Sequence, residues 1–236
     1  MTALVQARDV TYHYPDGTPA LDTVAFTVAA GERVALLGPT GAGKSTLLQS
    51  LNGLLRPSAG AVLVGGVAVN DETVTAVRRR VGLVFQNPDD QLFLPSLLED
   101  VAFGPLNAGA SRAEAATRSH AVLEALGLAA AHDRAAHHLS GGERRLAALA
   151  TVLVSQPDLL VLDEPSGDLD ARSRRRLRDI LAERREALLV ATHDLEFVRG
   201  LCSRALVLVA GKLAWDGALD VLLADRAMME RFGLVA

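Results

Sequence analysis

Cysteine, tryptophan and long apolar runs are scarce in this sequence. Cys202 is the only cysteine among 236 residues, and aromatic residues make up 4%. A single cysteine cannot form an internal disulfide bond, which excludes a disulfide-stapled scaffold and favours a reducing compartment. No apolar run approaches the roughly 20 residues that cross a bilayer, and the start MTALVQARDV lacks the pattern of an export signal. We therefore expect a protein that reaches a membrane only through a partner.

Neither sign of charge predominates in the sequence. The formal net charge is −4, and lysine and arginine do not gather into one long basic run. No nucleic-acid surface is predicted from this distribution. Hydrophobic residues make up 50% of the chain, enough for a sizeable core in one domain or in a domain with a smaller lobe.

The order of the predicted elements indicates an α/β fold. Residues 5–14 and 23–28 read as a hairpin, and short apolar runs at 33–38, 61–69 and 81–85 read as further strands. A helix is expected from Lys44 to about Leu55. Residues 88–154 are almost wholly helical in composition, with Ser111 and Glu114 as a capping box. Strands at 159–165 and 187–194, an arginine-rich helix at 171–185, a hairpin at 204–217 and a final helix follow. This alternation predicts a mostly parallel sheet interrupted by a helical insert.

The stretch GPTGAGKST, residues 38–46, follows a predicted strand and opens a predicted helix. It fits G-x-x-x-x-G-K-[ST], in which glycines let backbone N–H groups turn around a phosphate at a helix N-terminus. Lys44 is expected to reach the β- and γ-phosphates, and the Ser45 hydroxyl to hold Mg²⁺. The alternative is a glycine-rich turn with an accidental lysine. The flanking strand and helix favour the phosphate site.

The stretch LLVLDEP, residues 159–165, supplies a second half for this site. Asp163 and Glu164 come at the end of an apolar strand, where ligands bind in open α/β sheets. We expect Asp163 to steady Mg²⁺ and Glu164 to polarise an attacking water. Alone, such an acidic pair indicates a solvated loop. Together with residues 38–46 it predicts a P-loop ATPase or a close relative.

The stretch LSGGERR, residues 139–145, has two compatible interpretations. Ser140 and Glu143 form a capping box at a helix start. The glycines that follow Ser140 weaken the first turn but expose its N–H groups to an anion. A second phosphate-binding helix start in a chain with one P-loop requires a phosphate from elsewhere.

The ordered set of motifs resembles the nucleotide-binding subunits of ABC transporters, over nearly the whole chain. It comprises YHYPDG at 12–17, Walker A at 38–46, Gln86, the signature at 139–143, Walker B at 159–164, SGDLD at 166–170 and THD at 192–194. The resemblance implies an α/β P-loop NTPase fold, with a RecA-like, mostly parallel sheet, an N-terminal antiparallel β-subdomain and a helical insert. One domain is expected over 1–236, with the nucleotide-binding core at 1–87 and 155–236 and the helical signature subdomain at 88–154.

The same resemblance implies a head-to-tail dimer that sandwiches two ATP molecules with Mg²⁺. The signature of one subunit is expected to bind the γ-phosphate held by Lys44 of the other. Glu164 is the expected general base, His193 contacts the γ-phosphate, and Gln86 approaches Mg²⁺ and the water. Asp170 couples the two sites, and Tyr14 stacks on adenine, although Tyr12 competes for that role and a half-buried strand aromatic is the alternative. The expected ATP-binding residues are Tyr14, Gly38, Pro39, Thr40, Gly41, Ala42, Gly43, Lys44, Ser45, Thr46, Ser140, Gly141, Gly142 and Asp170, and the expected metal-binding residues are Ser45, Gln86 and Asp163.

The stretches FQNPDDQLF, residues 85–93, and EDVAFGPLN, residues 99–107, resemble the ATPases of energy-coupling factor transporters, the cobalt and nickel importer type. The resemblance implies a transmembrane coupling protein and a substrate-binding membrane subunit as partners, at the cytoplasmic face of the membrane. Asp89, Asp90 and Gln91 are expected to engage basic residues of the partner. Leu92 and Phe93 are expected to pack in its groove. The alternative for the acidic pair is a solvated helix start capped by Asn87 or Asp89.

Two departures and one omission qualify this resemblance. Glu143 stands where many relatives have glutamine and Leu146 where many have arginine, so a polar contact near the signature helix is expected to be missing. The chain is also expected to lack most of the C-terminal dimerisation region that many relatives carry. Either a homodimer or a heterodimer with a paralogue fits. The family's substrates suggest cobalt or nickel first and a vitamin such as biotin second.

Other classes of P-loop protein fit less well. An ABC subunit for another transport process is the nearest alternative, and the sequence before EDVAFGPLN argues against it. Soluble ABC ATPases of translation or DNA repair carry two cassettes or long coiled-coil inserts, whereas the space from Lys44 to Ser140 is compact here. A P-loop kinase or GTPase leaves LSGG and His193 without a role. His137 and His138 have no third ligand at metal-site spacing, so we expect loop residues there.

Overall fold

The computed structural model describes residues 3–235, which form two compact units. The first unit comprises residues 3–83, 158–164 and 185–235, and the second comprises 84–157 and 165–184. The expected domain also included residues 1, 2 and 236, which lie outside the described residues. The division by sequence assigned residues 165–184 to the nucleotide-binding core, whereas in the structure they cluster with the helical residues.

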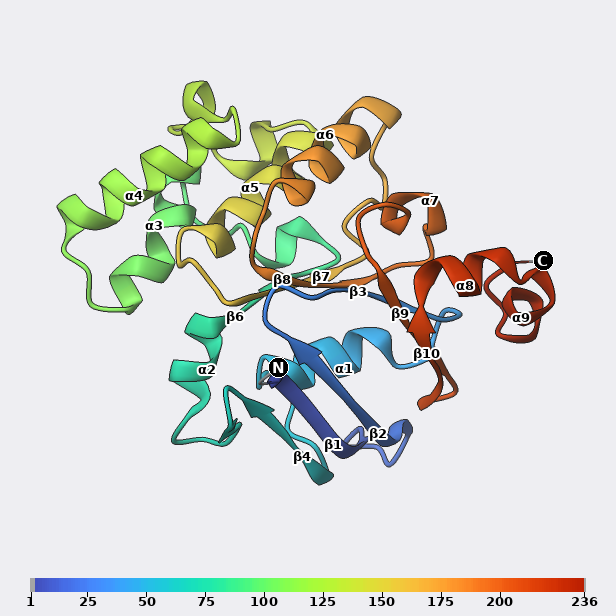
Figure 1. The fold of residues 1–236 in the computed structure, drawn as a ribbon. Coiled ribbons are helices and arrows are strands. Elements are labelled where there is room, and N and C mark those ends of the chain that lie inside the picture. Colours follow the sequence, from blue (N-terminus) through green and yellow to red (C-terminus); the bar gives the residue numbers. More distant parts are fainter. Residues whose placement is uncertain (1–2, 236) are drawn as a thin grey trace. The chain divides into compact units, whose positions relative to one another are not determined.

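An antiparallel sheet carries the N-terminal part of the first unit (Figure 1). Its strands, in spatial order, are β2 (Pro19–Ala29), β1 (Ala3–His13), β4 (Ala59–Val64) and β5 (Val67–Ala68). The predicted hairpin between β1 and β2 is confirmed, with Val5 opposite Val28. The apolar run at 61–69 is two strands rather than one, because Gly65 and Gly66 hold φ at 57° and 83° and turn the chain between them.

A second sheet forms the centre of the first unit. Its order is β10 (Lys212–Ala218), β9 (Arg204–Val209), β3 (Arg33–Leu37), β8 (Ala187–Ala191), β7 (Leu159–Asp163) and β6 (Val81–Val84). Strands β9, β3, β8 and β7 run parallel, and β10 is antiparallel to β9. Every residue of β7 and β8 is buried, as expected for parallel strands covered on both faces. The predicted mostly parallel sheet is confirmed.

Within residues 3–235, the helices of the first unit are α1 (Lys44–Leu51), α2 (Val74–Arg80), α7 (Leu195–Val198), α8 (Leu219–Ala224) and α9 (Arg226–Arg231). The helix expected to reach about Leu55 ends at Leu51, because Gly53 takes a left-handed φ of 72° and directs the N–H of Leu54 back to Gln49. The expected final helix is divided at Asp225, whose side chain accepts from the N–H of Met228 and so caps α9.

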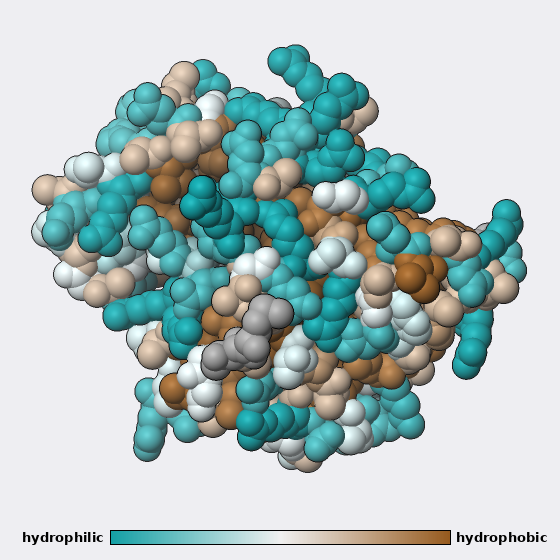
Figure 2. Space-filling model, viewed as in Figure 1, coloured by the Kyte–Doolittle hydropathy of each residue, from teal (hydrophilic) through white to brown (hydrophobic). Residues whose placement is uncertain are grey.

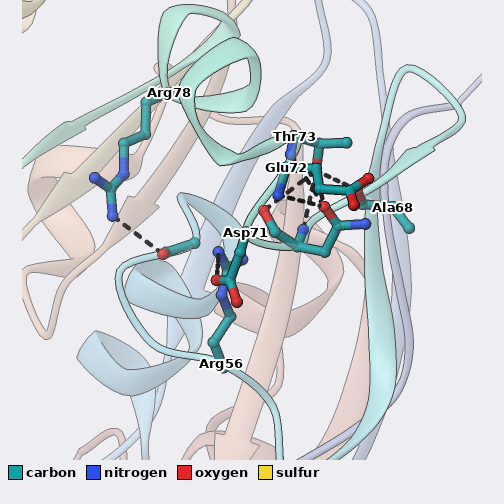
Figure 3. A network of polar contacts seen from close by, with 8 residues as sticks. Arg56, Ala68, Asp71, Glu72, Thr73 and Arg78 are labelled. Carbon is teal, nitrogen blue, oxygen red and sulfur yellow. Dashed lines mark hydrogen bonds and ion pairs between the residues drawn. The ribbon is translucent and has the colours of Figure 1, made fainter.

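A polar network joins the segment after α1 to the start of α2 (Figure 3). Arg56 forms an ion pair of 2.8 Å with Asp71, and Arg78 donates to the carbonyl of Gly53 at 3.2 Å. The Thr73 hydroxyl donates to the carbonyl of Ala68 at 2.6 Å. These contacts hold a short helix that the sequence analysis did not predict.

The second unit is built from the helices α3 (Leu97–Asn107), α4 (Arg112–Ala125), α5 (Gly141–Leu153) and α6 (Ala171–Ala182), with short 3₁₀ turns η1 (Pro88–Asp90), η2 (Ala129–Ala131) and η3 (Ala136–His138). Each of the four α-helices starts at a side-chain cap: Ser96, Ser111, Ser140 and Asp170. The predicted capping box at Ser111 and Glu114 is confirmed. The apolar core of this unit includes Leu97, Val101, Leu123 and Leu149.

The surface is mainly hydrophilic on the face shown in Figure 2, where hydrophobic residues show in smaller areas between hydrophilic ones. No helix within residues 3–235 is long and apolar enough to cross a bilayer.

Candidate nucleotide-binding and hydrolysis site

The loop between β3 and α1 is a cradle for an anion. Gly38 and Gly43 hold φ at 148° and 98°, and a Cβ at either position would collide with a carbonyl oxygen, that of Leu208 or of Ala20. Only glycine therefore fits there. Gly43 caps α1 without any side-chain hydrogen bond, and the first turn of α1 carries no acidic residue. The N–H groups at this helix start suit a phosphate.

Lys44 is buried at the base of this cradle, with 9% of its surface exposed. Its Nζ donates to the carbonyls of Gly38 at 2.8 Å and Pro39 at 3.1 Å. Burial lowers the pKa of the ammonium, and the charges of Glu164 and Asp163 oppose that shift. The two carboxylates therefore act on the lysine, as expected for a phosphate site that also binds a cation.

Glu164 lies just beyond the end of β7, in a strained backbone conformation with φ of 43°. A left-handed non-glycine residue costs about 1 kcal/mol or more and concentrates at functional sites. Its N–H donates to the carbonyl of Ala191 at 2.8 Å. Its Oε2 accepts from Thr192 Oγ1 at 3.0 Å and from the N–H of His193 at 3.3 Å, and lies 3.0 Å from His193 Nδ1. The structure thus brings the predicted base and the predicted histidine together.

Thr192 was not predicted from the sequence. Its side chain is fully buried, and its hydroxyl donates to Glu164 while accepting from the N–H of Asp194 at 3.0 Å. Because a hydroxyl that donates to a carboxylate oxygen fixes its rotamer, Thr192 is a positioning residue for Glu164.

Replacing Thr192 with valine is expected to lower kcat for ATP hydrolysis about tenfold while leaving KM for ATP unchanged. Valine has the same shape but cannot donate to Glu164, so the carboxylate loses its orientation. Unfolding free energy should fall by about 2 kcal/mol, because the hydroxyl's bonds to Glu164 and to the N–H of Asp194 are both lost. Phosphate release and thermal unfolding measure the two effects, with the exposed Thr117→Val on α4 as the control. A rise in KM with kcat unchanged would assign Thr192 to nucleotide binding instead.

The two predicted aromatic candidates differ in exposure. Tyr12 is buried, whereas Tyr14 is 41% exposed. The Tyr14 hydroxyl lies 2.8 Å from Thr46 Oγ1, and its ring meets the Tyr12 ring edge to face at 5.3 Å. Tyr14, fixed to the start of α1, is therefore the ring available for stacking.

The two predicted oxygen ligands of a cation that belong to this unit, Ser45 and Asp163, lie at the start of α1 and at the end of β7. No group of three His, Cys, Asp or Glu side chains suited to hold a metal occurs within residues 3–235. A cation at this place needs further oxygens, such as those of a phosphate, which is the manner in which Mg²⁺ binds at nucleotide sites. The residues present fit Mg²⁺ bound together with a nucleotide.

The predicted signature lies at the start of α5 in the second unit. Ser140 caps this helix, Gly141 has open space around it, and a Cβ at Gly142 would come within 2.5 Å of Ser173 Oγ. Asp170 caps α6 by accepting from the N–H of Ser173 at 2.7 Å. The signature helix and the Asp170 turn are thus joined through Ser173.

Arg145 is a further residue that the sequence analysis missed. It is 5% exposed, and its Nη1 donates to the carbonyls of Gln86 at 2.7 Å and Phe85 at 3.2 Å. We expected a polar contact to be missing near α5, because Leu146 stands where many relatives have arginine. Arg145, one position earlier, makes polar contacts there. Leu146 is buried, and Arg145 beside it ties α5 to the backbone of Gln86.

The segment after Gln86 differs from the prediction at two positions. Gln91 accepts from the N–H of Phe85 at 3.2 Å and donates to Thr151 Oγ1 at 2.6 Å, and Leu92 is 6% exposed. Both side chains turn inward, because Gln91 hydrogen-bonds to α5 and Leu92 packs in the core of the unit. The expectation that these two residues contact a partner was wrong.

The other residues of that segment remain exposed. Asp89 and Asp90 lie in η1, where Asn87 accepts from the N–H of Asp89 at 3.2 Å and is therefore the cap. Phe93 is 64% exposed. A surface of two carboxylates and one aromatic ring follows the Gln86 position.

Residues 21–167 match the ABC transporter family. The chain belongs to this family. It is an ATPase cassette, and the predicted fold class is confirmed.

Three curated relatives are similar over almost the whole cassette. A putative ABC transporter ATP-binding protein of Streptomyces coelicolor is 50% identical, over 96% of this chain and 87% of its own. The energy-coupling factor transporter ATP-binding protein EcfA of Methanothermobacter thermautotrophicus is 44% identical, over 98% and 76%. The cobalt import ATP-binding protein CbiO of Rhodobacter capsulatus is 44% identical, over 99% and 85%.

Solved structures show the same architecture. CbiO1 from Clostridium perfringens, described as part of the ABC transporter complex cbiONQ, is 32% identical with a TM-score of 0.85, over 99% of this chain and 96% of that chain. The ATP-binding cassette MJ0796, in a dimeric post-hydrolysis state with ADP and phosphate, is 28% identical with a TM-score of 0.83, over 91% and 98%. The predicted resemblance to the energy-coupling factor type is confirmed as a similarity of sequence and fold. This cassette is the ATPase subunit of a transporter.

Proposed function

We propose that the chain is the ATP-hydrolysing subunit of an energy-coupling factor importer, closing as a head-to-tail dimer on two ATP molecules. One observation carries the hydrolytic part of the proposal: Glu164 is held by Thr192 and His193 at the end of β7, with its charge acting on Lys44. A base, a phosphate-binding lysine and a glycine cradle within one unit constitute a site for phosphoryl transfer to water.

The start of α5 supports the proposed dimer. Ser140, Gly141 and Gly142 form a second anion-binding helix start, but the chain has one glycine cradle of the P-loop type. A γ-phosphate held by Lys44 of a second subunit satisfies this start. The similarity to a cassette described as dimeric with ADP and phosphate supports this arrangement. A homodimer and a heterodimer with a paralogue both meet this requirement.

Within each site, the side chains take separate roles. Glu164 accepts a proton from the attacking water, and His193, whose side chain is 78% exposed, contacts the γ-phosphate. Lys44 and the N–H groups of the cradle hold the phosphates, and Tyr14 stacks on the adenine ring. Asp170, at the cap of α6, transmits closure between the two sites.

Ser45, Asp163 and Gln86 are the proposed metal-binding residues. When bound with ATP, Mg²⁺ neutralises charge that develops on the phosphates. The chain contributes the serine hydroxyl and the aspartate carboxylate that hold it, and the Gln86 side chain that approaches it. The tie from Arg145 to the Gln86 carbonyl fixes the backbone from which that side chain extends.

A docking surface on the second unit is proposed to contact the membrane partner. We define it as Asp89, Asp90, Phe93, Phe103 and Leu106. The rings of Phe93 and Phe103 meet edge to face at 5.4 Å between centroids. Phe93, Phe103 and Leu106 are 64%, 45% and 41% exposed, respectively. Exposed aromatic side chains beside carboxylates suit a partner that offers basic and apolar side chains, such as the short cytoplasmic helix of a membrane protein.

A buried carboxylate anchors the backbone beneath this surface. Asp100, which is 4% exposed, accepts from the N–H groups of Phe93 and Leu94 at 3.0 Å each. Burial raises the pKa of the Asp100 carboxyl, and the two backbone hydrogen bonds oppose that shift. The ring of Phe93 is therefore presented from a fixed loop, which lowers the entropy cost of binding a partner.

Replacing Asp89 and Asp90 together with alanine is expected to weaken co-purification with the membrane partner about tenfold while basal ATP hydrolysis stays within about twofold. The matched control is the adjacent acidic pair of the first unit, Asp71 and Glu72 (Figure 3), also replaced by alanine. Recovery of the membrane complex from detergent extracts and phosphate release by the isolated cassette measure the two effects. A larger loss of hydrolysis than of assembly would place the pair in catalysis.

The transported substrate is proposed from the relatives. EcfA is named for an energy-coupling factor transporter, CbiO for cobalt import, and CbiO1 for the cbiONQ complex. We propose cobalt or nickel first and a vitamin such as biotin second, with the cassette bound peripherally at the cytoplasmic face. Identification of the membrane proteins that co-purify tests the type of importer. A transmembrane partner without an energy-coupling factor component would contradict it.

A further inference from the structure

Two helices of the second unit begin with the same capping box. At α4, Glu114 Oε2 accepts from the N–H and the hydroxyl of Ser111, both at 2.9 Å, and the N–H of Glu114 donates back at 3.3 Å. At α5, Glu143 Oε2 accepts from the N–H and the hydroxyl of Ser140 at 2.8 and 2.7 Å, and its N–H donates back at 3.3 Å. The chain thus contains a matched pair of caps, of which only one is at the signature.

The carboxylates of both caps are ionised at neutral pH. Backbone and side-chain hydrogen bonds from the serine of each box lower the pKa of Glu114 and of Glu143. The charges of Arg134 and Arg176 lower that of Glu143 further. A negative charge therefore lies at the N-terminus of α5, where the proposed function requires the γ-phosphate of a second subunit.

The proton of the Ser140 hydroxyl is already used in a hydrogen bond to Glu143. A serine hydroxyl has one proton to donate, and that of Ser140 is directed to Glu143 Oε2. For the hydroxyl to donate to a γ-phosphate, it must leave the carboxylate. The carboxylate then faces a phosphate of like charge without that hydrogen bond.

We propose that Glu143 acts as an internal competitor of the γ-phosphate at the signature, so that it raises the ATP concentration needed to close the dimer. The inference rests on the proposed head-to-tail dimer and deepens it by assigning a regulatory role to the acidic residue of LSGGE. A cassette with this residue stays open at ATP concentrations that close one with an uncharged side chain. Like charges within a few Å at a partly buried site correspond to about a tenfold change in a binding constant.

The test uses the full chain with Glu164→Gln, in which ATP-driven dimers accumulate without hydrolysis. Sedimentation velocity over an ATP titration gives the concentration at half-maximal dimer. Adding Glu143→Gln is expected to lower this concentration about tenfold at low salt, with a smaller difference at high salt because ions screen the repulsion. Adding Glu143→Met, which has no amide to bind the nucleotide, should also lower it. Glu143→Asp, which keeps the charge, should remain near the parent.

Glu114→Gln is the matched control, because it removes the same charge from the same cap away from the signature. It should lower thermal stability about as much as Glu143→Gln and leave the ATP requirement unchanged. The inference is overturned if Glu143→Gln leaves the ATP concentration at half-maximal dimer unchanged or raises it, or if Glu114→Gln shifts that concentration equally. It is also overturned if Glu143→Gln lowers the concentration and Glu143→Met does not. A shift in Glu143→Asp, which keeps the charge, overturns it as well. A Glu164→Gln parent that never dimerises with ATP overturns the proposed dimer itself, and the inference with it. If the parent dimerises with ATP but Glu143→Gln does not change the ATP concentration needed, the inference about Glu143 is wrong and the proposed dimer stands.

Discussion

Replacing Glu164 with glutamine is expected to lower ATP hydrolysis about 100-fold or more while ATP binding persists. The amide keeps the size of the side chain, and its carbonyl oxygen can still accept from Thr192 Oγ1 and the N–H of His193. The amide is not basic, so it cannot take a proton from water. ATP then stays intact between two subunits, and a stable dimer accumulates in the presence of ATP.

Phosphate release measures the first effect of this substitution, and size-exclusion chromatography with and without ATP measures the second. Glu124→Gln on the exposed face of α4 is the control for loss of one negative charge. Near-normal turnover in Glu164→Gln would show that another group activates the water. Lost ATP binding would instead assign Glu164 to holding the nucleotide.

The parts of the fold that the sequence predicts are those whose chemistry is local. Glycine is the residue that tolerates the left-handed backbone at Gly43, and a continuous apolar run such as that of β7 fits a strand buried on both faces. The capping boxes at Ser111 and Ser140 also need only residues three apart. Each of these features can therefore be predicted without knowledge of its neighbours in space.

The features that the sequence did not predict depend on partners far along the chain. Gln91 turns inward because Thr151 on α5 offers it a hydroxyl, and Arg145 is buried because the carbonyls of Phe85 and Gln86 take its donors. Thr192 looks like an ordinary strand residue until Glu164 is placed 3.0 Å from its hydroxyl. Side-chain direction in these places follows from tertiary contacts, so the sequence alone did not show that Gln91 and Leu92 turn into the second unit.

Replacing Ser140 with arginine is expected to abolish the ATP-dependent dimer while nucleotide binding by the monomer is retained. Ser140 is exposed at the start of α5, and Gly141 after it has open space around it. A long guanidinium side chain there occupies the space that the γ-phosphate of a second subunit requires. Binding within one subunit depends on Lys44 and the cradle of the first unit, which the substitution does not touch.

The substitution also removes the cap of α5, at a cost of about 1 kcal/mol, and this effect has to be separated from steric exclusion. Ser111→Arg is the matched control, because it removes the equivalent cap of α4 and lies away from the signature. In the Glu164→Gln background, sedimentation with ATP should show dimers for Ser111→Arg and monomers for Ser140→Arg. A fluorescent ATP analogue should bind both monomers with equal affinity. Lost nucleotide binding by the Ser140→Arg monomer would mean that the signature serves the ATP of its own subunit, because a residue acting only across the dimer has no part in binding before closure.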